Sequence, residues 1–219
     1  MASDPNTGFD DARAALVDRL IERGYIDRPA TERAMRAVPR HAFVPDPRRE
    51  AAYRDRPLPI GAGQTISAPH MVAVMTDLLA PAPDDDILEI GTGCGYHAAV
   101  TSEPLDEGTV FSVEAEPELA RAARARFARL GYDVRVCVGD GHEGWAAHAP
   151  YDGAYLTCAP ETVPEAITEQ VRPGGTVVAP VGRGQQELLR LTRRADGSVE
   201  RERHGSVRFV PMRATGVDD

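Results

Sequence analysis

The chain of 219 residues contains no lysine, and all 25 of its basic side chains are arginine. Aspartate and glutamate together number 34, so the formal net charge is −9. A general nucleic-acid binder would show a basic stripe, and this surplus of carboxylates argues against that class. The absence of lysine also means that no lysine ammonium group can bind an anionic ligand.

Cysteines and long apolar runs are also scarce. Cys94, Cys137 and Cys158 are widely spaced and form no CxxC pair, so neither a disulfide framework nor a metal site is indicated. No run approaches the roughly 18 apolar residues that cross a bilayer, and the polar, acidic start MASDPNTGFDD is unlike a signal peptide. We therefore expect a cytoplasmic protein with reduced thiols and no membrane association. The 42% of hydrophobic residues is enough for a folded core.

The chain before residue 85 has the pattern of helices joined by proline-rich loops. Helices are predicted over 10–23 and 31–38. Within 71–79, apolar side chains recur at i, i+3, i+4, i+7 and i+8, which indicates an amphipathic helix. Ser67 stands where its N-cap is expected, and Pro69 fits its first turn.

After residue 85, apolar strands alternate with helices. Strands are predicted at 85–91, 109–115, 133–140, 151–157 and 175–182, helices at 117–130 and 164–171, and two late strands at 187–194 and 206–212. The sequence PGG at 173–175 is expected to end the second helix. This alternation predicts an α/β fold with a doubly wound, mostly parallel Rossmann-like sheet that binds ligands at the carboxyl ends of its strands. No helix separates the two late strands, so we expect an antiparallel edge.

The most informative local motif is Gly91-Thr92-Gly93-Cys94-Gly95, between a predicted strand and a predicted helix. Its glycines allow a tight turn and a close approach to a ligand. The dinucleotide fingerprint is GxGxxG, whereas this spacing is GxGxG with Glu89 two residues before it. A carboxylate there would repel a pyrophosphate but not the cationic head of S-adenosylmethionine. A tight turn without any ligand is the alternative.

Two more acidic residues follow the next two strands. Glu114 comes 19 residues after Gly95, where a carboxylate can accept hydrogen bonds from both ribose hydroxyls. Asp140 follows the third strand, where it could accept from the exocyclic amine of adenine. Alone, each could be a solvated charge or a common turn; in this order they favour an S-adenosylmethionine-dependent methyltransferase over a dehydrogenase. The predicted cofactor-binding residues are Glu89, Gly91, Thr92, Gly93, Gly95, Glu114, Asp140 and Gly141.

Several longer segments resemble the protein-L-isoaspartate O-methyltransferase family. They include VPRHAFVP (38–45), RPLPIGAGQTISAPHM (56–71), LEIGTGCGYHAAV (88–100) and VRFVPM (207–212), of which GQTISAPHM is very specific to that family. The resemblance implies a single class I methyltransferase domain, with 1–80 as a helical cap and substrate-binding segment and 81–219 as the cofactor-binding core. It also implies methyl esterification of the free α-carboxylate of L-isoaspartyl residues in damaged proteins and peptides, with repair through a succinimide.

The resemblance also implies residue roles. Ser67 would hydrogen-bond the isoaspartyl carboxylate as the catalytic residue, Thr65, Ile66 and His70 would line the same pocket, and Val207 to Val210 would hold the substrate backbone. From the residues alone, Ser67 and the free N–H groups of the following helix can form an anion site. Ser67 could also simply cap that helix, and His70 could be an ordinary first-turn histidine. Glu89 could order either the helical cap or the cofactor head.

Other readings of the same residues stay open. A relative of this fold could methylate a tRNA base or a small carboxylate, and a paralogue could bind isoaspartyl protein without turnover. A tRNA enzyme would need a basic entry face, and only the arginine-rich stretch 121–129 offers one. The complete cofactor set favours a working enzyme, which we expect to be a monomer that binds no nucleic acid. The acidic, lysine-free composition fits a GC-rich genome or a salt-adapted source such as a halophilic archaeon.

Overall fold

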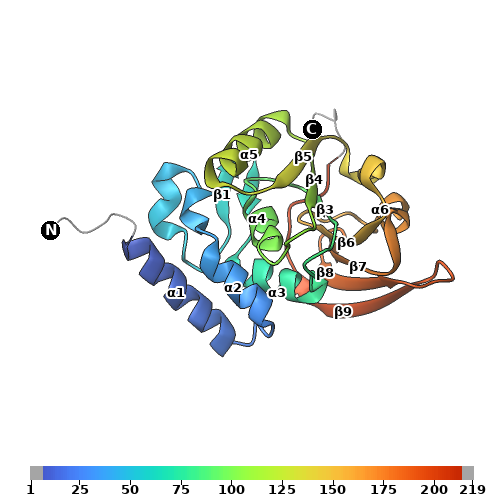
Figure 1. Cartoon of the computed structure of the whole chain (residues 1–219), viewed down its shortest axis with the longest axis horizontal. Helices are drawn as coiled ribbons and strands as arrows, with labels where there is room; N and C mark the ends of the chain where they lie inside the picture. The colour runs from blue at the N-terminus through green and yellow to red at the C-terminus, as the bar shows by residue number, and fades with distance from the viewer. Residues whose placement is uncertain (1–6, 214–219) are drawn as a thin grey trace.

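A seven-stranded sheet forms the centre of the molecule in the computed structural model, which describes residues 7–213 (Figure 1). Its strands are β3 (Ile87–Ile90), β4 (Val110–Glu114), β5 (Val134–Val138), β6 (Tyr151–Leu156), β7 (Val171–Val181), β8 (Gln186–Arg193) and β9 (Val199–Val207). Their order is β5-β4-β3-β6-β7-β8-β9. The first five of these in spatial order pair in parallel, whereas β8 and β9 are antiparallel to their neighbours. The predicted doubly wound sheet with an antiparallel edge is confirmed.

Within residues 7–213, six α-helices surround this sheet (Figure 1). They are α1 (Thr7–Glu22), α2 (Pro29–Ala37), α3 (Pro69–Leu79), α4 (Tyr96–Ser102), α5 (Pro117–Leu130) and α6 (Glu165–Gln170). Helix α5 begins with its proline at the first turn and ends where Gly131 adopts a φ of +83°, as its sequence predicts. Among residues 7–213, no helix is both long and apolar enough to cross a membrane.

The predicted proline-rich loop between α2 and α3 contains more regular structure than expected. It holds the 3₁₀ helices η1 (Arg40–Ala42) and η2 (Asp46–Ala51) and a small antiparallel hairpin of β1 (Leu58–Gly61) and β2 (Gln64–Ile66). Further 3₁₀ turns, η3 (Gly141–Glu143) and η4 (Ala146–His148), follow β5. The hairpin carries the GQTIS segment to the edge of the central sheet, where the cavity described below opens.

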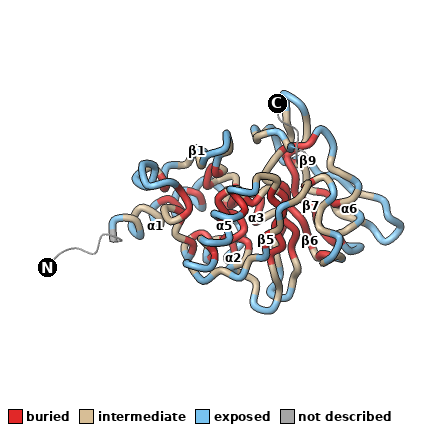
Figure 2. The backbone as a smooth tube through the Cα atoms, turned by 90° about the horizontal axis from the view of Figure 1, so that it is seen from above, coloured by how far each residue is buried: buried red, intermediate tan, exposed pale blue. Residues whose placement is uncertain are grey.

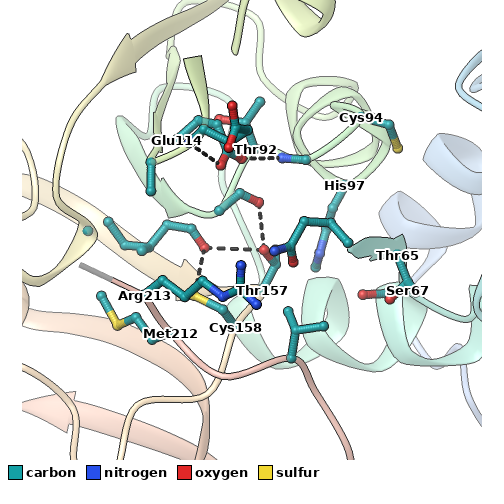
Figure 3. Close-up of a pocket in the computed structure, with 18 of the residues that line it drawn as sticks. Thr65, Ser67, Thr92, Cys94, His97, Glu114, Thr157, Cys158, Met212 and Arg213 are labelled. Atoms are coloured by element: carbon teal, nitrogen blue, oxygen red, sulfur yellow. Dashed lines mark hydrogen bonds between the residues drawn. The ribbon is translucent and has the colours of Figure 1, made fainter. Parts of the chain in front are cut away.

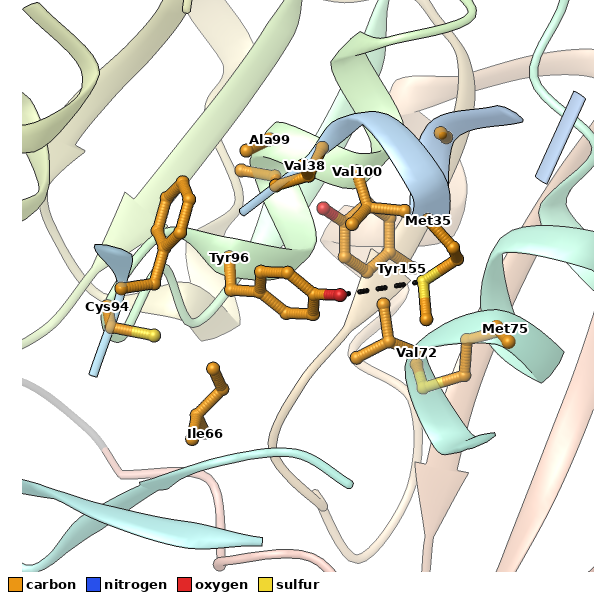
Figure 4. Close-up of a cluster of buried hydrophobic side chains, with 14 of the residues drawn as sticks. Met35, Val38, Ile66, Val72, Met75, Cys94, Tyr96, Ala99, Val100 and Tyr155 are labelled. Atoms are coloured by element: carbon orange, nitrogen blue, oxygen red, sulfur yellow. Dashed lines mark hydrogen bonds between the residues drawn. The ribbon is translucent and has the colours of Figure 1, made fainter. Parts of the chain in front are cut away.

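Alternating side chains of the strands form two separate cores on the two faces of the sheet. Ile87, Val110 and Tyr155 belong to the cluster that includes α1 to α5, part of which Figure 4 shows around Tyr155, whereas Leu88 and Phe111 belong to the cluster that includes α6. Successive residues of a strand point to opposite faces, so near-continuous apolar runs are what a sheet covered on both faces requires. Figure 2 shows the buried strands at the centre and the exposed backbone around them.

The predicted last strand is wrong in its position. The expected strand was 206–212, but β9 spans Val199–Val207, a polar stretch exposed along most of its length. β9 pairs with β8 alone, at the edge of the sheet. Because its side chains are mostly exposed, they carry no apolar pattern from which the strand could be predicted. The apolar residues after Val207 leave the sheet instead, and Pro211 forms an isolated bridge with Ala159.

We expected the sequence PGG at 173–175 to end a helix, but it does not. Helix α6 already ends at Gln170, and β7 begins at Val171 and runs through these residues. Its pairing with β6 shifts register between Tyr151 and Gly153. Proline and glycine in a strand often accompany such an irregularity, and here they were mistaken for a helix stop.

Candidate active site

A cavity of about 580 Å³ opens at the carboxyl ends of β3, β4 and β6. The hairpin β1–β2 and the segment Val210–Arg213 close its other sides. In Figure 3, Glu114 and Thr92 lie on one side of it, Thr65 and Ser67 on another, and Cys158, Met212 and Arg213 on a third. The lining includes the predicted residues Thr65, Ile66, Ser67, Gly91, Thr92, Gly93, Glu114, Gly141 and Val210. It does not include the predicted residues His70, Glu89, Gly95, Asp140 and Val207.

The glycine loop after β3 has no room for side chains at two of its positions. Gly91 adopts a φ of +97°, and a Cβ there would collide with the hydroxyl of Thr157. Gly95 adopts a φ of +87°, and a Cβ would lie 2.5 Å from the ring of Phe127 on α5. Gly91 therefore keeps the floor of the cavity open, and Gly95 allows the loop to pack against α5.

Glu114 joins the end of β4 to the glycine loop. Its side chain is 7% exposed and accepts hydrogen bonds from the backbone N–H of Gly93 at 2.7 Å and of Glu116 at 3.0 Å. A carboxylate has about four acceptor positions, so these two bonds leave capacity on the side that lines the cavity. The position suits the pair of ribose hydroxyls that the sequence predicted for Glu114.

The turn after β5 places Gly141, rather than Asp140, in the lining. Asp140 accepts from the backbone N–H of His142 at 2.9 Å and pairs with His142 Nδ1 at 2.8 Å. A Cβ on Gly141 would lie 2.5 Å from Ile90 Cγ2, so only glycine lets this turn approach the end of β3. The contact between Asp140 and adenine stays a prediction.

Glu89 lies inside the sheet rather than at the cavity. It is fully buried, and the two oxygens of its carboxyl group accept from Ser112 Oγ at 2.5 Å and from the Tyr155 hydroxyl at 2.8 Å. Burial raises the pKa of Glu89 to about 8, so the group is mostly uncharged at neutral pH. The predicted repulsion between Glu89 and a pyrophosphate therefore has little physical basis. Glu89 instead links β4 to β6. Ser112 Oγ continues the link to Thr92 Oγ1 in the lining, at 2.5 Å.

Ser67 does not cap α3, contrary to our expectation. The N-cap is Ala68, whose own side chain makes no capping hydrogen bond. Asp55, which sequence reasoning missed, accepts from the backbone N–H of His70 at 3.0 Å. Pro69 has no N–H, and the N–H of Met71 bonds to Ala68 O at 3.0 Å. The predicted anion site made from the N–H groups of α3 is therefore wrong, because these groups already have partners.

His70 and Val207 also lie outside the cavity lining. The imidazole of His70 pairs with Asp55 at 2.8 Å and its ring centroid lies 5.1 Å from that of Tyr25. His70 therefore has the contacts of an ordinary first-turn histidine. Val207 ends β9 and packs against the large core cluster, whereas Val210 lines the cavity.

Two lining residues of chemical interest were not singled out in the sequence. His97 on α4 follows the glycine loop directly, and that proximity was the only signal for it. Arg213 is the one cationic side chain among the described residues that line the cavity, and nothing in its local sequence pointed there. The thiols of Cys94 and Cys158 also line the cavity; burial raises the pKa of both, that of Cys158 to about 12, so neither is a thiolate nucleophile.

These features suit an adenosyl cofactor with an amino-acid tail. The glycine loop and Gly141 allow close backbone approach where a Cβ would collide, and the Glu114 carboxylate stands beside the loop with spare acceptor capacity. Ligands of open parallel sheets bind at this edge. The residues present thus fit S-adenosylmethionine, and Glu114, the glycine loop and Gly141 would hold it.

Comparison with known proteins agrees with this geometry. Residues 11–216 match the family model of protein-L-isoaspartate(D-aspartate) O-methyltransferases. A protein-L-isoaspartate O-methyltransferase from Methanopyrus kandleri is 50% identical over 97% of this chain and 95% of its own length. A second, from Methylorubrum extorquens, is 47% identical over 99% of this chain and 95% of its own length.

Solved structures show the same fold. A protein-L-isoaspartate O-methyltransferase structure, 27% identical, superposes with a TM-score of 0.85 over 93% of this chain, which spans 66% of that longer chain. A Plasmodium falciparum structure named for the same activity, in complex with S-adenosyl-L-homocysteine, has a TM-score of 0.80 at 21% identity, covering 92% of this chain and 98% of its own. The chain therefore belongs to the protein-L-isoaspartate(D-aspartate) O-methyltransferase family.

Proposed function

We propose that this protein uses S-adenosylmethionine to methylate the free α-carboxylate of L-isoaspartyl residues in damaged proteins and peptides. The observation that carries the proposal is the shared cavity, which Glu114 and the glycine loop line on one side and Thr65 to Ser67 line on another. The close relatives carry the name of this activity over nearly the full length of the chain. The neighbouring backbone amide nitrogen then attacks the ester carbonyl and expels methanol to give a succinimide, which water opens in part to normal aspartate.

The substrate carboxylate needs binding rather than activation. A free carboxyl group has a pKa near 4, so it is already an anion at neutral pH and no general base is needed. The side chain of Ser67 is half-buried in the lining and has no hydrogen-bond partner among residues 7–213. Its hydroxyl donates to the carboxylate. The guanidinium of Arg213 supplies the positive charge that the absent lysines and the occupied α3 N–H groups do not.

When bound, S-adenosylmethionine supplies a methyl group on a cationic sulfur. The opposite charges of donor and acceptor diminish as the methyl group transfers, so a site shielded from water favours the transfer. The hairpin β1–β2 and Val210 line the cavity beside the strand ends and reduce its contact with water, and Ser67 and Arg213 orient the carboxylate. Positioning and desolvation, rather than proton transfer, therefore account for the rate.

The test is labelled methyl transfer to a pair of peptides that differ only in one isoaspartyl or normal aspartyl linkage. The proposal predicts transfer to the isoaspartyl peptide alone. Transfer to neither or equal transfer to both would refute it. Substitution of tRNA and of small carboxylic acids in the same assay tests the remaining substrates of this fold.

We further propose that the protein acts as a monomer in the cytoplasm. This chain by itself contributes both the Glu114 side and the Ser67 side of the cavity, so the proposed reaction calls on no residue of a second copy. The sedimentation coefficient of the active protein tests whether it is a monomer. A sedimenting dimer that loses methyl transfer on dilution would contradict it.

A further inference from the structure

The chain leaves the central sheet after Val207 and then runs along the cavity. Val207 ends β9 and pairs with Gln186, the first residue of β8. The residues Val210–Arg213 line the cavity, and Figure 3 shows Met212 and Arg213 at its wall. Outside the sheet no strand ladder holds this segment, so its position depends on other contacts.

The side-chain amide of Gln186 holds the first part of this segment. Its Oε1 accepts from the backbone N–H of Phe209 at 2.6 Å, and its Nε2 donates to the backbone carbonyl of Phe209 at 3.1 Å. A residue of a neighbouring antiparallel strand would make the same two bonds. Because the N–H can only donate and the carbonyl can only accept, the two bonds fix the orientation of the amide. Gln186 therefore replaces, with its side chain, the strand partner that Phe209 lacks.

The two parts of the segment have different anchors. Apart from the two bonds of the amide, no hydrogen bond to the backbone of Arg208 or Phe209 is found within residues 7–213. The later part is held at the end of β6, where Ala159 N–H donates to Val210 O at 2.8 Å and Met212 N–H donates to Ala159 O at 2.9 Å. Loss of the amide would therefore free the backbone just before Val210 and leave the later anchor in place.

We propose that Gln186 is a positioning residue for the peptide substrate. By holding Phe209, it keeps Val210 and Arg213 in the wall of the cavity. Gln186 is not itself part of the lining, so it acts through this segment and touches no ligand. The role rests on the proposed function, in which Arg213 attracts the isoaspartyl carboxylate. The cofactor side of the cavity, built from Glu114 and the glycine loop, has its own hydrogen bonds and does not depend on Gln186.

Two substitutions at this position and one beside it test the role. Gln186→Met keeps the length of the side chain and removes both hydrogen bonds. Gln186→Glu keeps an acceptor for Phe209 N–H but sets a second acceptor against the Phe209 carbonyl. Gln185→Met is the matched control, since Gln185 is exposed, lies outside the lining and makes no side-chain hydrogen bond within residues 7–213. Labelled methyl transfer gives KM for an isoaspartyl peptide, calorimetry gives Kd for S-adenosyl-L-homocysteine, and unfolding midpoints check the folding of each variant.

We expect Gln186→Met to raise KM for the peptide about tenfold, the size of one lost hydrogen bond, while Kd for S-adenosyl-L-homocysteine stays within about twofold of the wild type. Gln186→Glu should raise KM at least as much, because its second carboxylate oxygen repels the Phe209 carbonyl. Gln185→Met should match the wild type in both constants. An unchanged KM in Gln186→Met, or equal losses in KM and Kd, would overturn the proposal.

Hydrogen exchange in the wild type tests the anchor without any variant. NMR should show a Phe209 amide that is protected from exchange, although this residue lies outside the sheet, and an Arg208 amide that exchanges freely. Equal exchange of the two amides would refute the anchor. A wild type that methylates no isoaspartyl peptide would refute the proposed function and the peptide role together. An active wild type with an unchanged KM in Gln186→Met would refute the role of Gln186 alone.

Discussion

Glu89 is a carboxyl group held in the middle of the sheet by Ser112 and Tyr155. Burial is the main cause of its raised pKa, about 8 in the folded protein, against an ordinary value near 4.3 in an unfolded chain. The folded state therefore binds more protons than the unfolded state between these two values. The contribution of Glu89 to the stability of the folded state is fully present below the lower pKa and is lost as the pH rises through the upper pKa.

The free energy of unfolding of the wild type should thus decline between about pH 5 and pH 8, by up to about 1.4 kcal/mol per pH unit. Glu89→Gln cannot ionise and should remove this slope. Urea unfolding of both proteins across that range measures the difference. Parallel curves for the two proteins would show that Glu89 does not titrate in this window.

Ser67 offers a hydroxyl to the cavity that has no partner within residues 7–213. Ser67→Ala should lower kcat/KM for an isoaspartyl peptide about tenfold, because a hydrogen bond to an anion is lost. Ser206→Ala, on the exposed strand β9, is the matched control and should behave as wild type. Full activity in Ser67→Ala would remove Ser67 from substrate binding.

Arg213 is expected to attract the substrate carboxylate. Arg213→Gln should raise KM for the isoaspartyl peptide about tenfold at low salt, and added salt should reduce the difference. Arg208 is a nearby exposed arginine outside the lining, so Arg208→Gln should leave KM unchanged. Equal effects of the two substitutions would indicate general charge attraction instead.

Among single residues, the sequence predicted those whose role depends on the backbone conformation or on a fixed position after a strand. The glycine loop and Glu114 are of this kind, and they are found at the cavity. Asp55, which occupies the N–H of His70, and Arg213 reach their places through tertiary contacts. No local pattern records such contacts, so neither residue could be predicted.

The glycine loop is the element whose geometry matters most for the site. Gly95 and Gly131 both adopt positive φ angles, +87° and +83°, but only Gly95 has no room for a Cβ, which would lie 2.5 Å from Phe127. A left-handed residue other than glycine costs roughly 1–2 kcal/mol, and overpacking adds about 1–3 kcal/mol. Gly131→Ala should therefore lower the free energy of unfolding by about 1–2 kcal/mol and Gly95→Ala by about 2–5 kcal/mol.

Chemical denaturation of the two variants measures this difference. Gly95→Ala should also weaken binding of S-adenosyl-L-homocysteine, because the displaced loop lines the cavity, whereas Gly131→Ala should not. Equal losses of stability would show that the Phe127 ring moves aside without cost.

Elements with a buried face were predicted well, and the exposed edge was not. Helix α5 was predicted at its observed bounds because apolar spacing, proline and glycine all agree. Strand β9 has one strand neighbour and little burial, so its position depends on pairing with β8. The apolar residues 209–212 were mistaken for part of the strand, whereas Val210, Pro211 and Met212 line the cavity instead.

Over the whole molecule, the charge of −9 is carried by carboxylates and arginines alone. Many arginines pair with carboxylates at the surface, such as Arg36 with Asp18 at 2.5 Å and Arg172 with Asp152 at 2.8 Å. Each exposed pair contributes at most about 1 kcal/mol, so the surplus of negative charge should dominate the response to salt.

If the composition is an adaptation to salt, molar KCl should raise the unfolding temperature relative to dilute buffer. Screening relieves the repulsion among carboxylates, and thermal unfolding at several KCl concentrations measures it. If the protein is no more stable in molar KCl than in dilute buffer, genome composition is the explanation for the missing lysines.

The activity itself is tested most directly by competition. An isoaspartyl peptide and the same peptide with a normal aspartyl linkage are mixed in equal amounts with the protein and S-adenosylmethionine, and mass spectrometry follows the methyl ester on each. The account predicts esterification of the isoaspartyl peptide while the aspartyl peptide stays unmodified. Equal esterification of both, or of neither, would contradict it.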